Sequence, residues 1–133
     1  MKEVFADTSF FIAFLSNDDE HYEQALNLMQ IFRGRITTTM WILAELGNYF
    51  SKSKTRLRFV PFVRDLSVDR RVLILPIDQA HFGSALEIYE NRSDKEWSIT
   101  DCTSFLIMKA RGIREAWTTD HHFEQAGFVK LLT

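Results

Sequence analysis

The sequence predicts an α/β fold in which a parallel sheet is covered by helices on both faces. Short apolar runs alternate along the chain with longer runs of helical periodicity, which is typical of strands joined by crossover helices. The clearest strand, residues 72–75, is a continuous Val-Leu-Ile-Leu run closed by a proline, as expected for a strand buried on both faces. A length of 133 residues suits one domain, so we expect a single domain over residues 1–133.

Periodicity and capping residues place the elements in chain order. We expect strands over residues 4–6, 35–38, 72–75, 115–117 and 128–130. We expect helices over residues 10–15, 21–32, 40–50, 57–66, 79–89, 98–110 and 120–125. Pro61 predicts a break or kink in the fourth of these helices, because proline lacks an amide hydrogen and clashes with the preceding turn. Gly112 is expected to end the helix that begins near Ser98.

Composition and charge exclude several classes of protein. The hydrophobic fraction is 46%, with 12 phenylalanines, which is too apolar for a disordered chain. The formal net charge of −2 lacks the basic balance that is usual for nucleic-acid-binding proteins. The one cysteine, Cys102, excludes an internal disulfide and a multi-cysteine zinc site, so a cytoplasmic location is expected. No apolar run approaches the roughly 20 residues that span a bilayer, so we expect no membrane segment.

Four acidic residues stand out by position. Asp7 follows the first predicted strand, Asp120 follows the fourth, and Asp101 lies in the first turn of its helix. Ligands of an open parallel sheet bind outside the carboxyl ends of its strands, where these three can converge. Glu45 is the only charged residue of an otherwise apolar helix, so we expect a buried carboxylate that needs a partner. Converging carboxylates repel one another unless a cation neutralises them, and Mg²⁺ and Mn²⁺ prefer such oxygen ligands.

Each acid also has a structural explanation. Aspartate is a favoured N-cap, which would account for Asp7 and Asp120. Ser98-x-x-Asp101 resembles a capping box, and on local grounds capping explains Asp101 better than chemistry does. An exposed position or a salt bridge to an arginine would account for Glu45. The case for a site therefore depends on the four acids as a set.

Four segments together resemble a known family. Val4-Phe-Ala-Asp7-Thr-Ser, the helical Glu45, Ser98-Ile-Thr-Asp101-Cys-Thr-Ser-Phe and Thr118-Thr-Asp120-His-His-Phe resemble a PIN domain, most closely the VapC-type toxins of toxin–antitoxin pairs. The resemblance covers nearly the whole chain, and the segment around Asp101 is its most specific part. It implies a parallel sheet of strand order 3-2-1-4-5 in a three-layer α/β/α domain. It also implies a Mg²⁺- or Mn²⁺-dependent endoribonuclease whose acidic quartet is Asp7, Glu45, Asp101 and Asp120, a homodimer, and silencing by an antitoxin protein.

Two further groups of residues are expected to assist the acids. Three hydroxyls lie next to them and either bond to a carboxylate or phosphate or simply cap helices: Thr8, Ser9 and Thr100. Four basic residues follow the helix that carries Glu45: Lys52, Lys54, Arg56 and Arg58. We expect them to bind the RNA backbone at one end of the active-site groove, although a solvated helix connection is the usual role of such a run.

Other chemistry-bearing residues are assigned to structure. Asp78 is expected to cap a helix. His121 and His122 look like a metal pair, but neighbours on a helix point in different directions, so His122 is assigned to packing. Cys102 is expected to be buried and unreactive. Two acids upstream of the Asp101 segment either lend charge to the site or, as we expect, are solvated in a loop: Asp94 and Glu96.

Three functions are compatible with this sequence. The leading one is an RNA-cleaving enzyme, acting as a toxin or in RNA processing. The second is a PIN-like module that binds RNA or protein without cutting, against which the intact acidic quartet argues. The third is a phosphatase with an aspartyl nucleophile, but Asp7-Thr-Ser lacks the second aspartate two residues on that such enzymes use. We also expect a two-fold homodimer with contacts among residues 21–66, since apolar helical surface remains for a partner.

Overall fold

Five parallel strands form the central sheet of the computed structural model, which describes residues 1–133 apart from the side chain of Ser53. The strands are β1 (Glu3–Ala6), β2 (Arg35–Thr39), β3 (Val72–Leu75), β4 (Glu115–Trp117) and β5 (Val129–Lys130). Their order is β3-β2-β1-β4-β5, and each neighbouring pair is parallel. This confirms the α/β class and the strand order that the family resemblance implied.

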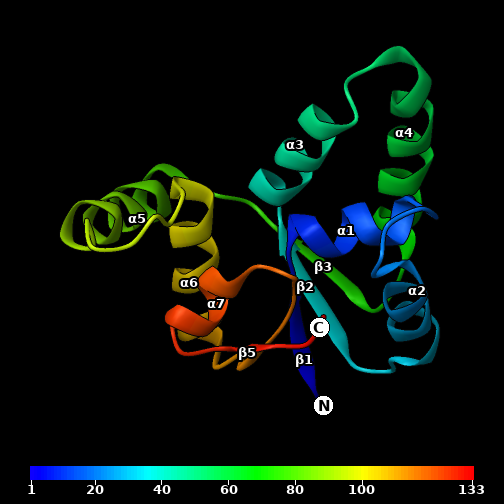
Figure 1. Cartoon of the computed structure of the whole chain (residues 1–133). Coiled ribbons are helices and arrows are strands. Elements are labelled where there is room, and N and C mark those ends of the chain that lie inside the picture. Colours follow the sequence, from blue (N-terminus) through cyan, green and yellow to red (C-terminus); the bar gives the residue numbers. More distant parts are fainter.

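Helices cover both faces of the sheet. They are α1 (Thr8–Leu15), α2 (Tyr22–Ile31), α3 (Met40–Tyr49), α4 (Ser53–Val68), α5 (Gln79–Asn91), α6 (Ile99–Arg111) and α7 (His121–Gln125). Figure 1 shows α1, α2 and α4 on one side of the sheet, α5, α6 and α7 on the other, and α3 above the upper strand ends. The connections from β1 to β2 and from β2 to β3 proceed toward one edge of the sheet, whereas those from β3 to β4 and from β4 to β5 proceed toward the other edge. Because crossovers between parallel strands are right-handed, the two sets of helices lie on opposite faces. Among the described residues, no helix combines the length and the apolar character needed to cross a membrane.

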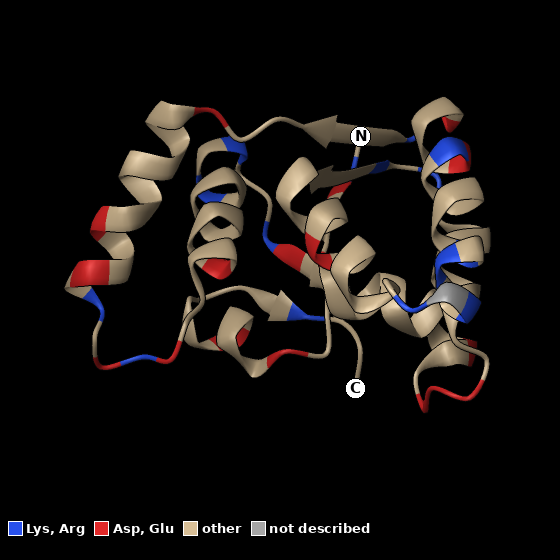
Figure 2. Cartoon of the chain, turned by 90° about the horizontal axis from the view of Figure 1, so that it is seen from above, with Lys and Arg blue, Asp and Glu red and all other residues tan. Residues whose placement is uncertain are grey.

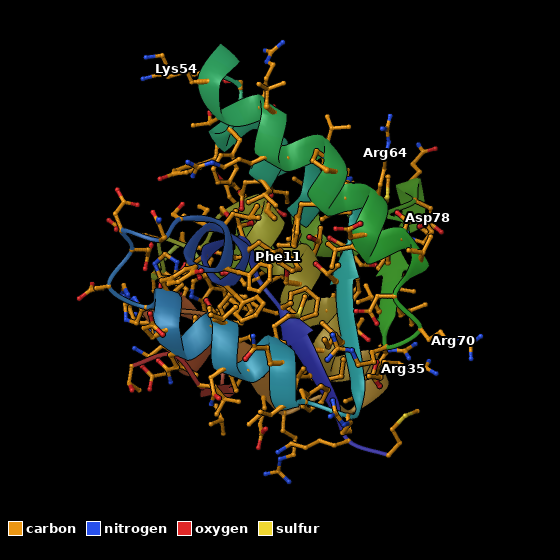
Figure 3. The ribbon with its side chains drawn as sticks, turned by 90° about the vertical axis from the view of Figure 1, so that its right-hand side faces the viewer. Phe11, Arg35, Lys54, Arg64, Arg70 and Asp78 are labelled. Carbon is orange, nitrogen blue, oxygen red and sulfur yellow. The ribbon has the colours of Figure 1, made fainter. Side chains whose placement is uncertain are left out.

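Aromatic side chains hold the helices of one face against the sheet. The Trp117 ring, at the end of β4, lies 4.7 Å from the Phe10 ring and 5.1 Å from the Phe32 ring. Phe11 points into the interior beneath α4 (Figure 3), where its ring meets that of Phe62 at 5.5 Å. Burying a side chain of this size contributes about 1.5–3 kcal/mol to folding. The carboxyl ends of β1 and β4 are therefore firmly supported from one side.

Most helix ends fall close to the expected residues, but α4, expected from residue 57, begins at Ser53. The Asp78 carboxylate accepts a hydrogen bond from the backbone N–H of His81 at 2.8 Å, so its capping role is confirmed. Ser98 and Asp101 form a reciprocal capping box at the start of α6. Gly112 ends the same helix with a φ of 70°, in the left-handed region where a side chain would be strained. Capping thus fixes the position of Asp101 without deciding whether it has a second role.

The break expected at Pro61 is wrong, because α4 continues through it as one helix of 16 residues. Pro61 is exposed, so its ring lies in solvent and the carbonyl that loses its bond can be hydrated. On the buried side, Phe62 and Leu66 anchor the same turns in the core. Tertiary packing therefore outweighs the local penalty of about 3 kcal/mol for a proline inside a helix.

Candidate active site

Asp7, Glu45, Asp101 and Asp120 line one open cavity of about 620 Å³. The cavity lies outside the carboxyl ends of β1 and β4. The connections leave these two central strands in opposite directions across the sheet, which opens a crevice between the first turns of their helices. The backbone N–H of Asp7 donates to the Trp117 carbonyl at 3.1 Å and so extends the strand pairing to the rim. The fold thus brings together all four acids that the sequence singled out.

Asp7 forms the buried floor of the cavity. It occupies the N-cap position of α1, but its side chain makes no capping bond, so the capping explanation is wrong for this residue. The carboxylate instead accepts hydrogen bonds from the hydroxyls of Thr118 at 2.8 Å and Ser9 at 3.3 Å. Burial raises the pKa of Asp7 from 3.8 to about 7; the Thr118 bond opposes this rise, and the nearby carboxylates of Asp101 and Glu45 add to it.

Asp101 and Asp120 cap helices and still face the cavity. Oδ2 of Asp101 accepts from the backbone N–H of Ser98 at 3.0 Å, and Oδ1 of Asp120 accepts from that of His122 at 2.9 Å. Each carboxylate keeps a second oxygen that has no hydrogen bond among the described residues. Burial raises the pKa of Asp101; the Ser98 bond opposes the rise, and the Asp120 carboxylate adds to it. Capping therefore orients both side chains without using up their ligand capacity.

Glu45 reaches the cavity from α3. The expectation that it is buried is wrong, since the residue is exposed. Three apolar residues pack one side of α3 into the core, Ile42, Leu43 and Leu46, while Glu45 lies on the side that walls the cavity. The Thr8 hydroxyl donates to Oε1 of Glu45 and joins α1 to α3 across the cavity. Glu45 thus belongs to the site by position and hydrogen bonding rather than by burial.

The expected hydroxyl support holds for two residues of three. Thr8 bonds to Glu45, and Ser9 bonds to Asp7 while its oxygen accepts from the backbone N–H of Thr119 at 3.0 Å. Thr100 lies in a neighbouring hollow with Trp41 and Ala44, next to Glu45. Within the described part of the chain no hydrogen bond joins its hydroxyl to one of the four acids, so the contacts do not support this role for Thr100.

Two residues at the site were not expected from the sequence. Thr118 is fully buried, donates to Asp7 at 2.8 Å and accepts from the backbone N–H of Asp120 at 3.0 Å, so one hydroxyl links two of the acids. The signal in the sequence is the spacing Thr-x-Asp at a strand end, typical of a turn in which the first side chain bonds two residues on. The other residue is His122, whose Nδ1 lies 3.0 Å from Oδ2 of Asp101 and 3.3 Å from Oδ1 of Asp120.

The histidine assignment therefore needs correction. His122 is not a packing residue alone, because its ring contacts two of the acids. The argument that adjacent histidines diverge is also wrong here, since the rings of His121 and His122 have centroids 4.6 Å apart. Both belong to the first turn of a helix of 5 residues, where a side chain can turn back toward the capping Asp120.

Cys102 is buried as expected, and burial raises its pKa to about 11.

Of the two upstream acids, one borders the cavity. Glu96 is exposed, as expected, but it lines the cavity with the four acids and adds negative charge to its rim. Asp94 accepts hydrogen bonds from Arg92 in the loop between α5 and α6 and has no contact with the site. Glu96 is thus a further acidic residue that the sequence reading left outside the site.

The basic residues after α3 lie beyond the outer end of the cavity wall. None of the four lines the acidic cavity in the described structure. Figure 2 shows basic residues grouped along α4, and Figure 3 shows Lys54 projecting from the end of that helix. The Arg56 guanidinium donates to the Ser51 carbonyl at 2.6 Å and 3.0 Å, and Arg58 donates to the Leu15 carbonyl at 3.3 Å. These positions can meet a long ligand but not one confined to the cavity.

Comparison with known proteins agrees with this geometry. Residues 4–129 match the family described as PIN domain. The chain belongs to the PIN-domain family. It is 28% identical, over 96% of its own length and 97% of the relative's, to "23S rRNA-specific endonuclease VapC20" of Mycobacterium tuberculosis. The solved structure of VapC20, a "Sarcin-Ricin loop cleaving toxin", superposes with a TM-score of 0.88 at 25% identity, covering 98% of this chain and 99% of that one.

The same fold occurs in other solved proteins. VapBC2 from Rickettsia felis, solved with a fragment of promoter DNA, matches with a TM-score of 0.66 at 16% identity, covering 96% of each chain. VapBC from Salmonella typhimurium matches with a TM-score of 0.64 at 19% identity, covering 98% and 96%. At these identities the likeness concerns the fold. The family match over residues 4–129 confirms the PIN-domain resemblance carried by the sequence motifs.

The donor set of the cavity fits a hard divalent cation. It offers carboxylates from four separate segments, and two of them, Asp7 and Asp101, have a raised pKa that partly reflects the neighbouring negative charges. Oxygen-only donor sets of this kind suit Mg²⁺ and Mn²⁺. The residues that would hold the ion are Asp7, Glu45, Asp101 and Asp120.

Proposed function

We propose that this chain is a divalent-metal-dependent endoribonuclease that hydrolyses RNA phosphodiester bonds and acts as the toxin of a toxin–antitoxin pair. The observation that carries the proposal is the convergence of Asp7, Glu45, Asp101 and Asp120 on one open cavity at the carboxyl ends of β1 and β4. The near full-length similarity of this chain to VapC20 supports the same function. The intact quartet favours cleavage over binding alone.

The residues of the cavity hold a fixed arrangement of charge. Thr8 positions Glu45, Thr118 and Ser9 position Asp7, and backbone N–H groups position the other two acids. A bound divalent cation would activate water and stabilise the charge that develops on the phosphate during in-line displacement. Charges that are held in position before the substrate arrives need less reorganisation during the reaction, which lowers its barrier. Mg²⁺ and Mn²⁺ are the ions we propose.

The substrate class that we propose is structured ribosomal RNA. VapC20 is named as specific for 23S rRNA, and its similarity to this chain covers 96% of the chain. An open cavity also suits a polymer whose strand passes across the site. The chain carries four exposed basic residues at the start of α4 that we propose bind the RNA backbone: Lys52, Lys54, Arg56 and Arg58. Such contacts offset the repulsion between an acidic cavity and phosphate groups and carry little sequence information.

We further propose that the toxin forms a homodimer and pairs with an antitoxin protein. Solved proteins of the same fold include VapBC complexes from two bacteria. Apolar side chains remain exposed within residues 21–66, among them Met40, Tyr49, Leu57 and Val60. Together these exposed side chains form apolar surface that a partner protein can cover. Light scattering at micromolar concentration should report twice the mass of 15.6 kDa, and a monomer would contradict the homodimer.

A cleavage assay on purified ribosomes and on total RNA tests the function. We expect Mn²⁺ or Mg²⁺ to produce discrete fragments whose ends primer extension maps to a few positions of the large-subunit RNA. EDTA should abolish cleavage, and replenishing the ion should restore it. RNA that binds but stays intact with either ion would favour the non-cleaving module. Cleavage that persists in EDTA would contradict metal dependence.

A further inference from the structure

Two adjacent histidines, His121 and His122, follow directly after Asp120, one acid of the quartet. Among the described residues, one group of three His, Cys, Asp or Glu side chains has ligand atoms that lie within 4.8 Å of one another: Asp120, His121 and His122. Nδ1 of His122 lies 3.3 Å from Oδ1 of Asp120, and Nδ1 of His121 lies 3.8 Å from the same oxygen. Neither distance makes a strong hydrogen bond. They do match the separation of two ligands on one metal ion.

The spacing fits tetrahedral coordination. Imidazole nitrogen and carboxylate oxygen bind Zn²⁺ at about 2.0–2.2 Å, which puts neighbouring ligand atoms about 3.4 Å apart in a tetrahedron. The two N···O distances, 3.3 Å and 3.8 Å, lie near this value. Nδ1 of His122 also forms a hydrogen bond with Oδ2 of Asp101 at 3.0 Å, which coordination of an ion by this nitrogen would replace, and the Asp101 carboxylate adds negative charge beside the site. His121 is largely exposed, so an ion can enter from solvent.

The donor set distinguishes this site from the acidic cavity. Imidazole suits borderline ions such as Zn²⁺, Co²⁺ and Ni²⁺, whereas Mg²⁺ takes oxygen ligands and keeps several waters. We propose that Asp120, His121 and His122 form a second metal site, selective for Zn²⁺, whose fourth position is left to water. Because Asp120 also belongs to the acidic quartet, Zn²⁺ at this site competes with Mn²⁺ for one carboxylate. This consequence rests on the proposed function, whereas Zn²⁺ binding itself does not.

Isothermal titration of the metal-free protein with Zn²⁺ tests the site directly. We expect the wild type to bind one Zn²⁺ per chain, and His121→Gln and His122→Gln each to weaken binding at least tenfold. His81→Gln is the matched control, because His81 also has a carboxylate at 3.5 Å, that of Asp78, but belongs to no group of three ligands among the described residues. Co²⁺ in place of Zn²⁺ should give the visible absorption of a tetrahedral ion, and that absorption should disappear in His121→Gln.

Several results would overturn the proposal. Wild-type protein that binds no Zn²⁺, or a His121→Gln variant that binds as the wild type does, removes the site. An equal loss of Zn²⁺ affinity in His81→Gln shows that Zn²⁺ is held elsewhere. If Glu45→Gln loses Zn²⁺ as His121→Gln does, the ion lies in the acidic cavity. In Mn²⁺ titrations followed by electron paramagnetic resonance, Zn²⁺ should weaken Mn²⁺ binding to the wild type and not to His121→Gln. RNA cleavage is read separately, so its absence would contradict the proposed function and leave Zn²⁺ binding standing.

Discussion

Replacing Asp7 by asparagine should stabilise the metal-free protein at neutral and alkaline pH. The side chain is only 6% exposed, and its pKa lies at about 7 in the native state against an ordinary value of 3.8. A native pKa that is raised means that ionising Asp7 opposes folding. The difference corresponds to about 4 kcal/mol, at about 1.4 kcal/mol for each pKa unit. Asparagine is nearly the same shape and carries no charge.

The pH dependence gives the prediction its sign. The unfolded chain loses the Asp7 proton near pH 3.8, whereas the native protein keeps it to about pH 7. Between these values the native state binds more protons, so stability declines as pH rises. The full penalty is present above pH 7 and is absent well below pH 3.8. Because a buried asparagine needs its own hydrogen bonds, which cost about 2 kcal/mol at any pH, we expect a net gain of about 2 kcal/mol at pH 8 and a net loss of about 2 kcal/mol near pH 4.

Thermal unfolding in EDTA at a series of pH values measures this effect. A gain of about 2 kcal/mol should raise the Tm of Asp7→Asn by roughly 6–10 °C at pH 8, and the loss near pH 4 should lower it by a comparable amount. Saturating Mn²⁺ should stabilise the wild type more than the variant, because an ion that binds only the native state raises its stability. The matched control is Asp78→Asn, which changes an aspartate outside the cavity. If Asp7→Asn lowered the Tm equally at both pH values, the raised pKa inferred for the buried Asp7 carboxylate would be wrong.

Three further predictions follow from the contacts. Thr118→Val removes the hydroxyl between Asp7 and the Asp120 backbone, so it should weaken Mn²⁺ binding and lower the free energy of unfolding by about 1–3 kcal/mol. Thr118→Ser keeps the hydroxyl and should retain both Mn²⁺ affinity and stability. Equal Mn²⁺ affinity in the two variants would argue against the positioning role. Cys102 is buried with a pKa of about 11, so iodoacetamide should not label it in native protein at pH 7.5, and rapid labelling would contradict the fold around it. The last change replaces with glutamine the four basic residues at the start of α4: Lys52, Lys54, Arg56 and Arg58. RNA binding should weaken and depend less on salt, with little change in the cleavage rate at saturating RNA. An unchanged salt dependence of affinity would show that these residues do not bind the RNA backbone.

Much of the fold follows from local patterns in the sequence. The run at residues 72–75 reads as a buried strand, and Gly112 marks the end of α6 because only a residue that tolerates a positive φ fits there. Pro61 shows where such reasoning fails. Its cost is local, but the packing of Phe62 and Leu66 that outweighs it depends on residues distant in the chain. Local rules therefore predict the elements better than they predict how far each extends.

The site could be predicted in part. Asp7 and Asp120 follow from strand ends, because the carboxyl ends of parallel strands share one edge of the sheet, and Asp101 follows from its place in the first turn of a helix. Glu45 was found for a wrong reason, since its helix exposes the side that walls the cavity. Thr118 and His122 act through contacts that bridge two acids, and such contacts exist only once the chain has folded. The candidate metal ligands can thus be predicted from the sequence, whereas the residues that position them are identified only from the structure.

The most direct test of the central claim is the rate of metal-dependent RNA cleavage by five matched variants. Four of them remove one charge each from the cavity while keeping the shape of the side chain: Asp7→Asn, Glu45→Gln, Asp101→Asn and Asp120→Asn. The fifth, Asp78→Asn, removes an equivalent charge from a helix cap outside the cavity. We predict that each of the four lowers the cleavage rate by about 100-fold or more with the fold intact, while Asp78→Asn cleaves as the wild type does. Cleavage abolished in Asp78→Asn but retained in Asp120→Asn would contradict the assignment of the active site.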